Sequence, residues 1–227
     1  MIQPILSFDV PPYRLSGTVY GTLLNSAASL AALGDTVNAA PYKAAPRAPV
    51  LYVKPRNTLA FDRDRVAVPP SAGELQVGAT LGLVIGRTAC RVSEADALSY
   101  LAGYTVAIDF SVPHDSFYRP SVRFKALDGS CVIGPSVVPA HRIPDPDHLA
   151  IRVYVDGTLA QPGSTGGMVR NAARLLADVT EFMTLAPGDI LLLGVPAGAP
   201  HAKAGQSVAV DIEGVGRLEN LLVKEEA

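Results

Sequence analysis

One carboxylate, Asp109, lies inside an apolar run and is a candidate for a functional residue. It follows Ala107 and Ile108 and precedes Phe110, in a stretch whose residue types favour a strand. A carboxylate buried there is costly unless it is paired with a cation, hydrogen-bonded or bound to a metal ion. The plain structural alternative is an aspartate at the end of a strand that caps the following loop.

Two lysines lie where an apolar run meets polar sequence. Lys125 falls in residues 122–126, which we interpret as a strand, so that Lys125 would share one face with Arg123. Lys54 ends the short apolar run before Pro55. Each lysine on its own could be an ordinary surface residue. Together with Asp109 they suit a pocket for a small polyanionic acid better than one for a nucleotide.

The histidines have no spacing typical of metal ligands or of a hydrolase. His114 lies in a loop with aromatic residues, but a lone loop histidine is most often polar surface. The motifs of zinc proteases, serine hydrolases and phosphate-binding loops are absent from the sequence. The glycine-rich run 194–198 precedes a loop with Pro and His rather than a helix, so phosphate binding is not expected there.

The elements that must position these residues are mostly strands. Asn25 is expected to cap the first helix, and Ser93 with Asp96 to open the second. Strands outnumber helices and do not alternate with them as βαβ units, which predicts one β-rich α+β domain over residues 1–227. The expected strands cover residues 18–24, 51–53, 77–85, 104–110, 122–126, 151–155, 158–159, 190–193 and 208–213, and the helices 26–33, 93–103 and 168–183, with turns over 62–74.

The composition excludes several classes of protein. The 227 residues are 48% hydrophobic and 18% charged, with a net charge of −2, so neither a disordered chain nor a basic nucleic-acid-binding surface is expected. The two cysteines form no pair with metal-ligand spacing, which favours reduced thiols. The uncharged run 15–34 is too polar for a membrane span. We therefore expect a cytoplasmic protein.

Short motifs in a fixed order resemble the fumarylacetoacetate hydrolase superfamily from about Gly21 to Val223. Singly each motif is weak, but their order and spacing together are specific. The resemblance implies a mixed β-roll with a few peripheral helices. The motifs are Lys54-Pro55 with Asn57-Thr58, Gly103-Tyr104-Thr105 leading to Asp109 and Ser111, Lys125 with Asp128-Gly129 and Gly134-Pro135, Gln161 with Thr165 and Met168, Pro187-Gly188-Asp189, Gly194-Val195-Pro196, and Gly214-Val215-Gly216.

A narrower set of motifs is similar to the bifunctional decarboxylase/isomerases of this family, in their N-terminal half or first subunit. These enzymes serve 4-hydroxyphenylacetate (homoprotocatechuate) breakdown. The resemblance implies an oligomer that acts on 5-carboxymethyl-2-oxo-hex-3-ene-1,7-dioate or on its decarboxylated diene. The motifs are Pro41-Tyr42-Lys43, Lys54 to Thr58, Gly78-Ala79-Thr80 and Ser116 to Pro120.

The sequence departs from the family at the metal site. Family members hold Mg²⁺ or Mn²⁺ with a Glu-x-Glu pair and a later Asp, but the pair falls here on Gly78 and Thr80, and only Asp109 remains. The His-Glu pair that activates water in the family falls on Ser29 and Ala32. We therefore expect a metal ion to be absent or weakly bound, and hydrolysis of a carbon–carbon bond to be disfavoured.

The resemblance implies roles for the charged residues. Lys125 would stabilise the enolate left by decarboxylation, and Lys54 would neutralise a substrate carboxylate. Asp109 would serve as the base for the isomerase step if burial raised its pKa. Residues expected to bind substrate are Arg56, Arg119 and Arg123 as bidentate clamps, with Thr165 and Gly194.

Two functions from different classes remain open at this point. The chain is either an active decarboxylase/isomerase subunit with a metal-poor site, or a catalytically silent paralogue that supports a metal-competent partner subunit. Retained Lys54, Asp109 and Lys125 favour the first, and the lost metal ligands favour the second. A binder of other 2-oxo acids is a third hypothesis.

Overall fold

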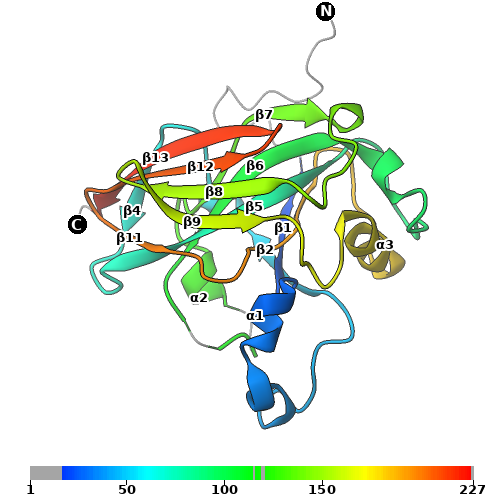
Figure 1. Ribbon diagram of the computed structural model, residues 1–227, viewed down its shortest axis with the longest axis horizontal. Helices are drawn as coiled ribbons and strands as arrows, with labels where there is room; N and C mark the ends of the chain where they lie inside the picture. The colour runs from blue at the N-terminus through cyan, green and yellow to red at the C-terminus, as the bar shows by residue number, and fades with distance from the viewer. Residues whose placement is uncertain (1–16, 115, 119–120, 226–227) are drawn as a thin grey trace, which may run out of the picture.

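The computed structural model describes residues 17–225 except 115, 119 and 120. Two β-sheets, with short helices at their ends, make up this part of the chain (Figure 1). None of its described helices has both the length and the apolar character that crossing a bilayer requires. The expected β-rich α+β fold is confirmed.

The larger sheet has eight strands and mixes parallel with antiparallel pairs. Its order is β2-β1-β10-β5-β6-β7-β3, and β11 pairs with the outer part of β5. The long β5–β6 pair forms its centre. The strands are β1 (Val19–Leu23), β2 (Val50–Lys54), β3 (Leu59–Ala60), β5 (Glu74–Ile85), β6 (Leu101–Ser111), β7 (Cys131–Pro139), β10 (Ile190–Leu192) and β11 (His201–Lys203).

The smaller sheet has five strands in the order β4-β13-β12-β8-β9 and lies across one face of the larger sheet (Figure 1). The residues of β8 and β9 that we expected as a hairpin form one. The strands are β4 (Arg65–Val68), β8 (Ala150–Val155), β9 (Thr158–Ser164), β12 (Ser207–Ile212) and β13 (Gly216–Lys224).

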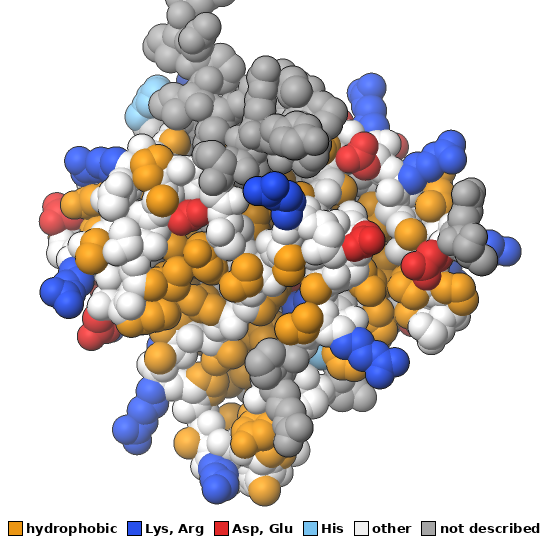
Figure 2. All heavy atoms as spheres, turned by 180° about the vertical axis from the view of Figure 1, so that it is seen from behind, with side chains coloured by type: hydrophobic (Ala, Val, Ile, Leu, Met, Phe, Trp, Pro, Cys, Tyr) orange, Lys and Arg blue, Asp and Glu red, His pale blue; other side chains and the backbone are white. Residues whose placement is uncertain are grey.

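The strands of the larger sheet bury apolar side chains on both faces. On β6, Val106 and Ile108 join the main core against the smaller sheet, whereas Ala107 between them belongs to a second cluster on the opposite face. Asp109 lies two residues beyond Ala107 and so points to that opposite face. Figure 2 shows a broad apolar area on the side of the molecule turned away from the view in Figure 1.

Helices are few and short. The helix α3 (Ala172–Phe182) is capped by Asn171 and buries Leu175 and Leu176, as its periodic apolar stripe predicts. The others are α1 (Ala27–Ala31), α2 (Val122–Lys125) and the 3₁₀ turns Gly34–Asn38, Arg56–Thr58, Ala97–Tyr100 and Ala140–Arg142.

Two sequence-based assignments are wrong. Residues 122–126 form no strand, because the Lys125 amide donates to the Ser121 carbonyl at 2.9 Å and closes the helical turn α2. Residues 93–103 form no long helix. Ser93 and Asp96 do make the expected capping contact, but β6 begins at Leu101, where pairing with β5 takes up the chain.

Smaller corrections concern the boundaries. Ser26 rather than Asn25 caps α1, by accepting the Ser29 amide, and the helix ends at Ala31. The strand β4 lies within residues 62–74, which we expected to hold only turns.

Candidate functional site

Asp109 is the centre of a buried charge cluster. Its Oδ1 accepts from Lys54 Nζ at 2.9 Å, and its Oδ2 accepts from Lys125 Nζ at 2.7 Å. The Tyr52 hydroxyl also donates to Oδ2. These three partners come from β2 and α2, which are far from Asp109 in sequence. The expectation that Lys54, Asp109 and Lys125 converge is therefore confirmed.

The two lysines are not equivalent. Lys54 Nζ donates to Asp109, to Ser130 Oγ at 3.0 Å and to the Lys125 carbonyl, so all three N–H bonds are used, and its side chain is fully buried. Lys125 Nζ has Asp109 as its one hydrogen-bond partner among the described residues, and it lies 4.7 Å from the Tyr52 ring centroid. Lys125 therefore keeps N–H bonds that a ligand can accept.

The charged groups of the cluster shift the pKa values of Asp109 and Tyr52. Burial by itself raises the pKa of Asp109, but the Lys125 and Lys54 ammonium groups, through charge and hydrogen bonds, outweigh burial and hold that pKa well below its usual range. Burial and the nearby Asp109 raise the pKa of Tyr52 well above its usual value, so its hydroxyl remains a donor. Our hypothesis that burial raises the pKa of Asp109 enough to make it a base is wrong.

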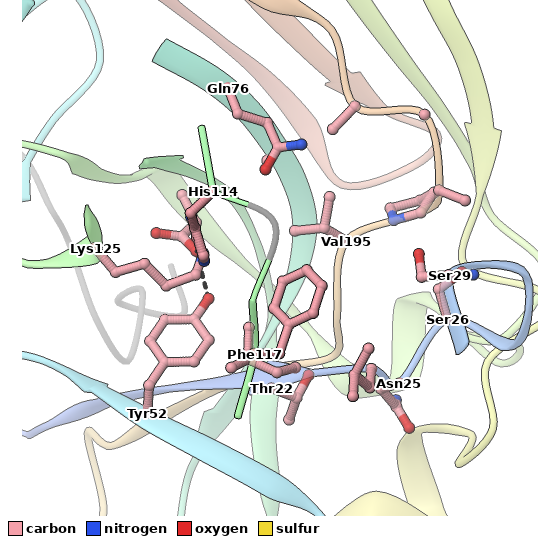
Figure 3. A pocket seen from close by; sticks show the side chains of 18 residues that line it. Thr22, Asn25, Ser26, Ser29, Tyr52, Gln76, His114, Phe117, Lys125 and Val195 are labelled. Carbon is pink, nitrogen blue, oxygen red and sulfur yellow. Dashed lines mark hydrogen bonds and ion pairs between the residues drawn. The ribbon is translucent and has the colours of Figure 1, made fainter. Parts of the chain in front are cut away.

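A cavity of about 110 Å³ opens beside this cluster. Figure 3 shows Lys125 and Tyr52 on one side of it and Ser26 and Ser29 on the opposite side. The remaining wall comes from the end of β1 with the two residues after it, from β5, from the loop that follows β10 and from the segment before α2. It includes Gln76, Gly78, His114, Phe117 and residues 195–199.

The residues at the family's metal positions do not fit a divalent cation. A Cβ on Gly78 would lie 2.6 Å from the Asp109 carbonyl oxygen, so position 78 has no room for a side chain. The Thr80 hydroxyl is engaged with Gly194, donating to its carbonyl at 2.9 Å and accepting its amide at 3.0 Å. Both Asp109 oxygens already accept from ammonium groups. In the described part of the chain, no three His, Cys, Asp or Glu side chains gather where they could hold a metal ion.

The arginines that we expected to clamp carboxylates do not line this cavity. Arg56 is exposed on the 3₁₀ turn after Pro55. Arg123 is also exposed, because two residues of a helix turn by about 200° and place it away from Lys125. Arg119 lies outside the described residues. A substrate-binding role for these three arginines stays a prediction.

Thr165 and Gly194 are both buried, and neither lines the cavity. The Thr165 hydroxyl accepts the Leu149 amide at 2.8 Å. Gly194 has φ +129°, a conformation that favours glycine, and leads into Val195, which does line the cavity. Their roles in binding substrate stay predictions.

Sequence reasoning missed several residues of the site. Tyr52 lies two residues before Lys54, so the two-residue strand period could have placed both on one face. The same period links Gln76 to Gly78 on β5. Ser130 gave no such signal, since it lies in a loop and reaches Lys54 only through the tertiary fold.

Comparison with known sequences gives a family and a set of relatives. The family described as "Fumarylacetoacetate (FAA) hydrolase C-terminal" matches residues 18–223. A "4-hydroxyphenylacetate degradation bifunctional isomerase/decarboxylase" of Escherichia coli is 39% identical over 211 residues, which are 93% of this chain and 48% of the relative. The chain thus spans about half the length of that relative.

Comparison with solved structures agrees. A 2-hydroxyhepta-2,4-diene-1,7-dioate isomerase from Mycobacterium marinum aligns with a TM-score of 0.77 and 28% identity, over 94% of this chain and 77% of that one. A fumarylpyruvate hydrolase from Pseudomonas aeruginosa, in complex with Mn²⁺ and pyruvate, aligns with a TM-score of 0.79 and 26% identity, over 92% and 90% of the two chains. At least one structure of this fold therefore holds Mn²⁺.

Proposed function

The chain belongs to the fumarylacetoacetate hydrolase family, and from this premise we propose that it is a decarboxylase/isomerase subunit of 4-hydroxyphenylacetate breakdown. Its substrates would be 5-carboxymethyl-2-oxo-hex-3-ene-1,7-dioate and the decarboxylated 2-hydroxy diene. The E. coli relative, an isomerase/decarboxylase of 4-hydroxyphenylacetate degradation, and the M. marinum isomerase structure support this choice.

The observation that carries the proposal is the position of Lys125. Two ammonium groups face one carboxylate in the cluster, which leaves one net positive charge at the wall of the cavity. Lys54 has no N–H bond left for a ligand, so this charge is available through Lys125. A buried cation with free N–H bonds beside a small cavity suits an acid that develops negative charge as it reacts.

The chemistry of decarboxylation needs such a group. When the triacid loses CO₂, the electron pair of the broken C–C bond moves through the alkene onto the 2-oxo oxygen. Lys125 Nζ can donate hydrogen bonds to that oxygen and stabilise the enolate. Lys54 then acts through Asp109: it holds the carboxylate that in turn orients Lys125. We propose that these residues work without a divalent cation, since the donor set at Gly78, Thr80 and Asp109 does not fit one.

The opposite side of the cavity offers neutral groups for the rest of the substrate. Ser29 lines the wall there, and Gln76 lines the wall from β5, at the top of the view in Figure 3. Neither side chain has a hydrogen-bond partner among the described residues. The backbone amide of Ser29 donates to the Ser26 hydroxyl, which caps α1. Neutral donors at these two positions would bind a carboxylate or carbonyl oxygen without competing with Lys125 for it.

The test is turnover by the purified chain. We expect the isolated protein to consume the triacid, release CO₂ and form the 2-oxo-ene product, at the same rate with and without EDTA. Absence of turnover by the folded chain, with or without Mg²⁺ or Mn²⁺, would contradict the proposal for the isolated subunit.

The second candidate is a catalytically silent subunit that supports a metal-competent paralogue. The loss of the metal ligands favours it, as does the broad apolar area of Figure 2 together with exposed Val53 and Val122. This function predicts that the chain is inactive alone and that mixing it with the paralogous subunit restores turnover. In that mixture, Lys125→Met in this chain should leave the rate unchanged, whereas the first function predicts a loss.

A further inference from the structure

The isomerase step needs a base, and few groups of the cavity wall can serve. Four titratable side chains line it among the described residues: Tyr52, Asp109, His114 and Lys125. Asp109 accepts from three donors and has a depressed pKa, so its affinity for another proton is low. Lys125 is ion-paired with it, and Tyr52 has a raised pKa and stays protonated. His114 is the group that remains.

The surroundings of His114 fix which ring nitrogen carries the proton. Its Nδ1 lies 2.8 Å from the Val112 carbonyl oxygen, which can only accept, so the neutral ring must carry its hydrogen on Nδ1. Nε2 is then an unprotonated acceptor. It is buried and has no hydrogen-bond partner in the described part of the chain. Leaving a buried polar atom without a hydrogen-bond partner is unfavourable, and a ligand hydroxyl would remove that cost.

The fold holds this ring in place from two sides. The His114 ring stacks on Phe124, with centroids 5.0 Å apart and planes at 14°, and meets the edge of Phe117 at 5.5 Å. Phe124 precedes Lys125 on α2, and its carbonyl accepts the Val112 amide at 2.9 Å. The turn α2 thus supports His114 with one residue and presents the ammonium group with the next. Figure 3 places His114 on the same side of the cavity as Lys125.

We propose that His114 Nε2 is the base of the isomerase step, a role that rests on the proposed function. Its lone pair takes the proton of the 2-hydroxyl group of 2-hydroxyhepta-2,4-diene-1,7-dioate. The O–H electrons form the C2=O bond, the C2=C3 pair becomes C3=C4, and the C4=C5 pair takes a proton at C5 from solvent, to which the protonated Nε2 returns its own. One proton moves from oxygen to carbon, and no oxidant or second reactant is needed. Lys125 stabilises the negative charge on the 2-oxygen in between.

The first test needs no substrate. Nitrogen-15 NMR of the wild-type chain with labelled histidine should show one ring whose Nδ1 is protonated and whose Nε2 is not. His114→Asn identifies that signal by its loss. A protonated Nε2 in the neutral ring would overturn the proposal whether or not the chain is an enzyme.

The second test uses the 2-hydroxy diene in D₂O, followed by absorbance and by deuterium at C5. His114→Asn keeps an N–H near the Val112 carbonyl but has no basic nitrogen, and His114→Gln is the second variant. We expect ketonisation over the background rate to fall at least about 100-fold in both. Binding of heptanedioate, measured by calorimetry, should stay within about threefold, since Lys125 remains. His148→Asn, at an exposed histidine outside the cavity, is the matched control and should match wild type.

The outcomes separate the two proposals. Wild-type rates in both His114 variants, with an active wild type, would overturn the role of His114 and leave the proposed function standing. A wild type that neither binds heptanedioate nor accelerates ketonisation would overturn the proposed function, and the base with it. Loss of heptanedioate binding together with ketonisation in His114→Asn would also overturn the base, because it would assign His114 to binding.

Discussion

Gly21 and Tyr52 are partners across the β1–β2 ladder, and the Tyr52 ring lies over the space where Gly21 has no side chain. A Cβ at position 21 would overlap ring carbons and the hydroxyl oxygen of Tyr52. The hydroxyl that donates to Asp109 therefore reaches it because position 21 is glycine. Gly21 therefore affects the central carboxylate of the site through the Tyr52 ring.

Gly21→Ala should move the Tyr52 ring and break its hydrogen bond to Asp109. A hydrogen bond to a charged group contributes about 1.5–3 kcal/mol, so we expect turnover to fall about tenfold or more while the chain stays folded. Steady-state kinetics measure the change. In a Tyr52→Ala background the same substitution should have little further effect, since the ring is already gone. An equal loss in both backgrounds would show that Gly21 acts in another way.

Lys125→Met and Lys54→Met should have different main effects. Lys125 has free N–H bonds at the cavity, so its loss should lower kcat by about 100-fold or more, with a smaller effect on stability. Lys54 is fully buried and makes three hydrogen bonds, so its loss should lower the free energy of unfolding by about 3–5 kcal/mol. Kinetics and denaturant unfolding of both variants measure this. Equal kinetic and equal stability effects would contradict the division of roles.

Asp109 should make stability depend on pH at the acid end. The folded form binds the Asp109 proton less tightly than the unfolded chain, since the lysines lower the pKa of this group. Its contribution is therefore complete above the unfolded pKa of about 3.9 and is lost as pH falls below it. Asp109→Asn should lack this dependence and be less stable at pH 7 by about 3–5 kcal/mol, because two buried ammonium groups lose their counter-charge. Unfolding curves from pH 7 to pH 2 measure both effects. Asp35→Asn, on an exposed turn, should change stability by less than about 0.5 kcal/mol.

The strands and the central triad could be predicted from the sequence because both depend on strong local signals. An alternating or continuous apolar run identifies a strand, and a carboxylate inside one demands a partner. Asp109 is such a carboxylate, and the two lysines are partners of the right kind. The family motifs that contain these three residues occur in the family's order along the chain, which supported placing the residues in one site.

The segment 122–126 shows where sequence reasoning fails. Its residue types favour a strand, but Lys125 is buried against Asp109 and the chain turns helically to bring it there. In a strand, Arg123 would have shared the face of Lys125, whereas in α2 it points to solvent. Four residues carry too weak a local preference to oppose one buried ion pair. The strand period could place Tyr52 on the face of Lys54, but the roles of Tyr52 and His114 depend on tertiary contacts that no local pattern gives.

The last prediction concerns the metal ion. The backbone of β5 passes so close to β6 that position 78 has no room for a carboxylate side chain, and Asp109 is held by two lysines. Addition of millimolar Mn²⁺ or Mg²⁺ should therefore not raise the melting temperature of the chain. A specific site at 100 times its Kd would add about 2.7 kcal/mol of stability, which thermal unfolding detects easily. Because the Asp109 carbonyl blocks a side chain at position 78, the double variant Gly78→Glu with Thr80→Glu should be destabilised and still gain nothing from Mn²⁺. Stabilisation of the wild type by Mn²⁺ that EDTA reverses would contradict this, and would mean that Asp109 exchanges its lysine partners for a metal ion.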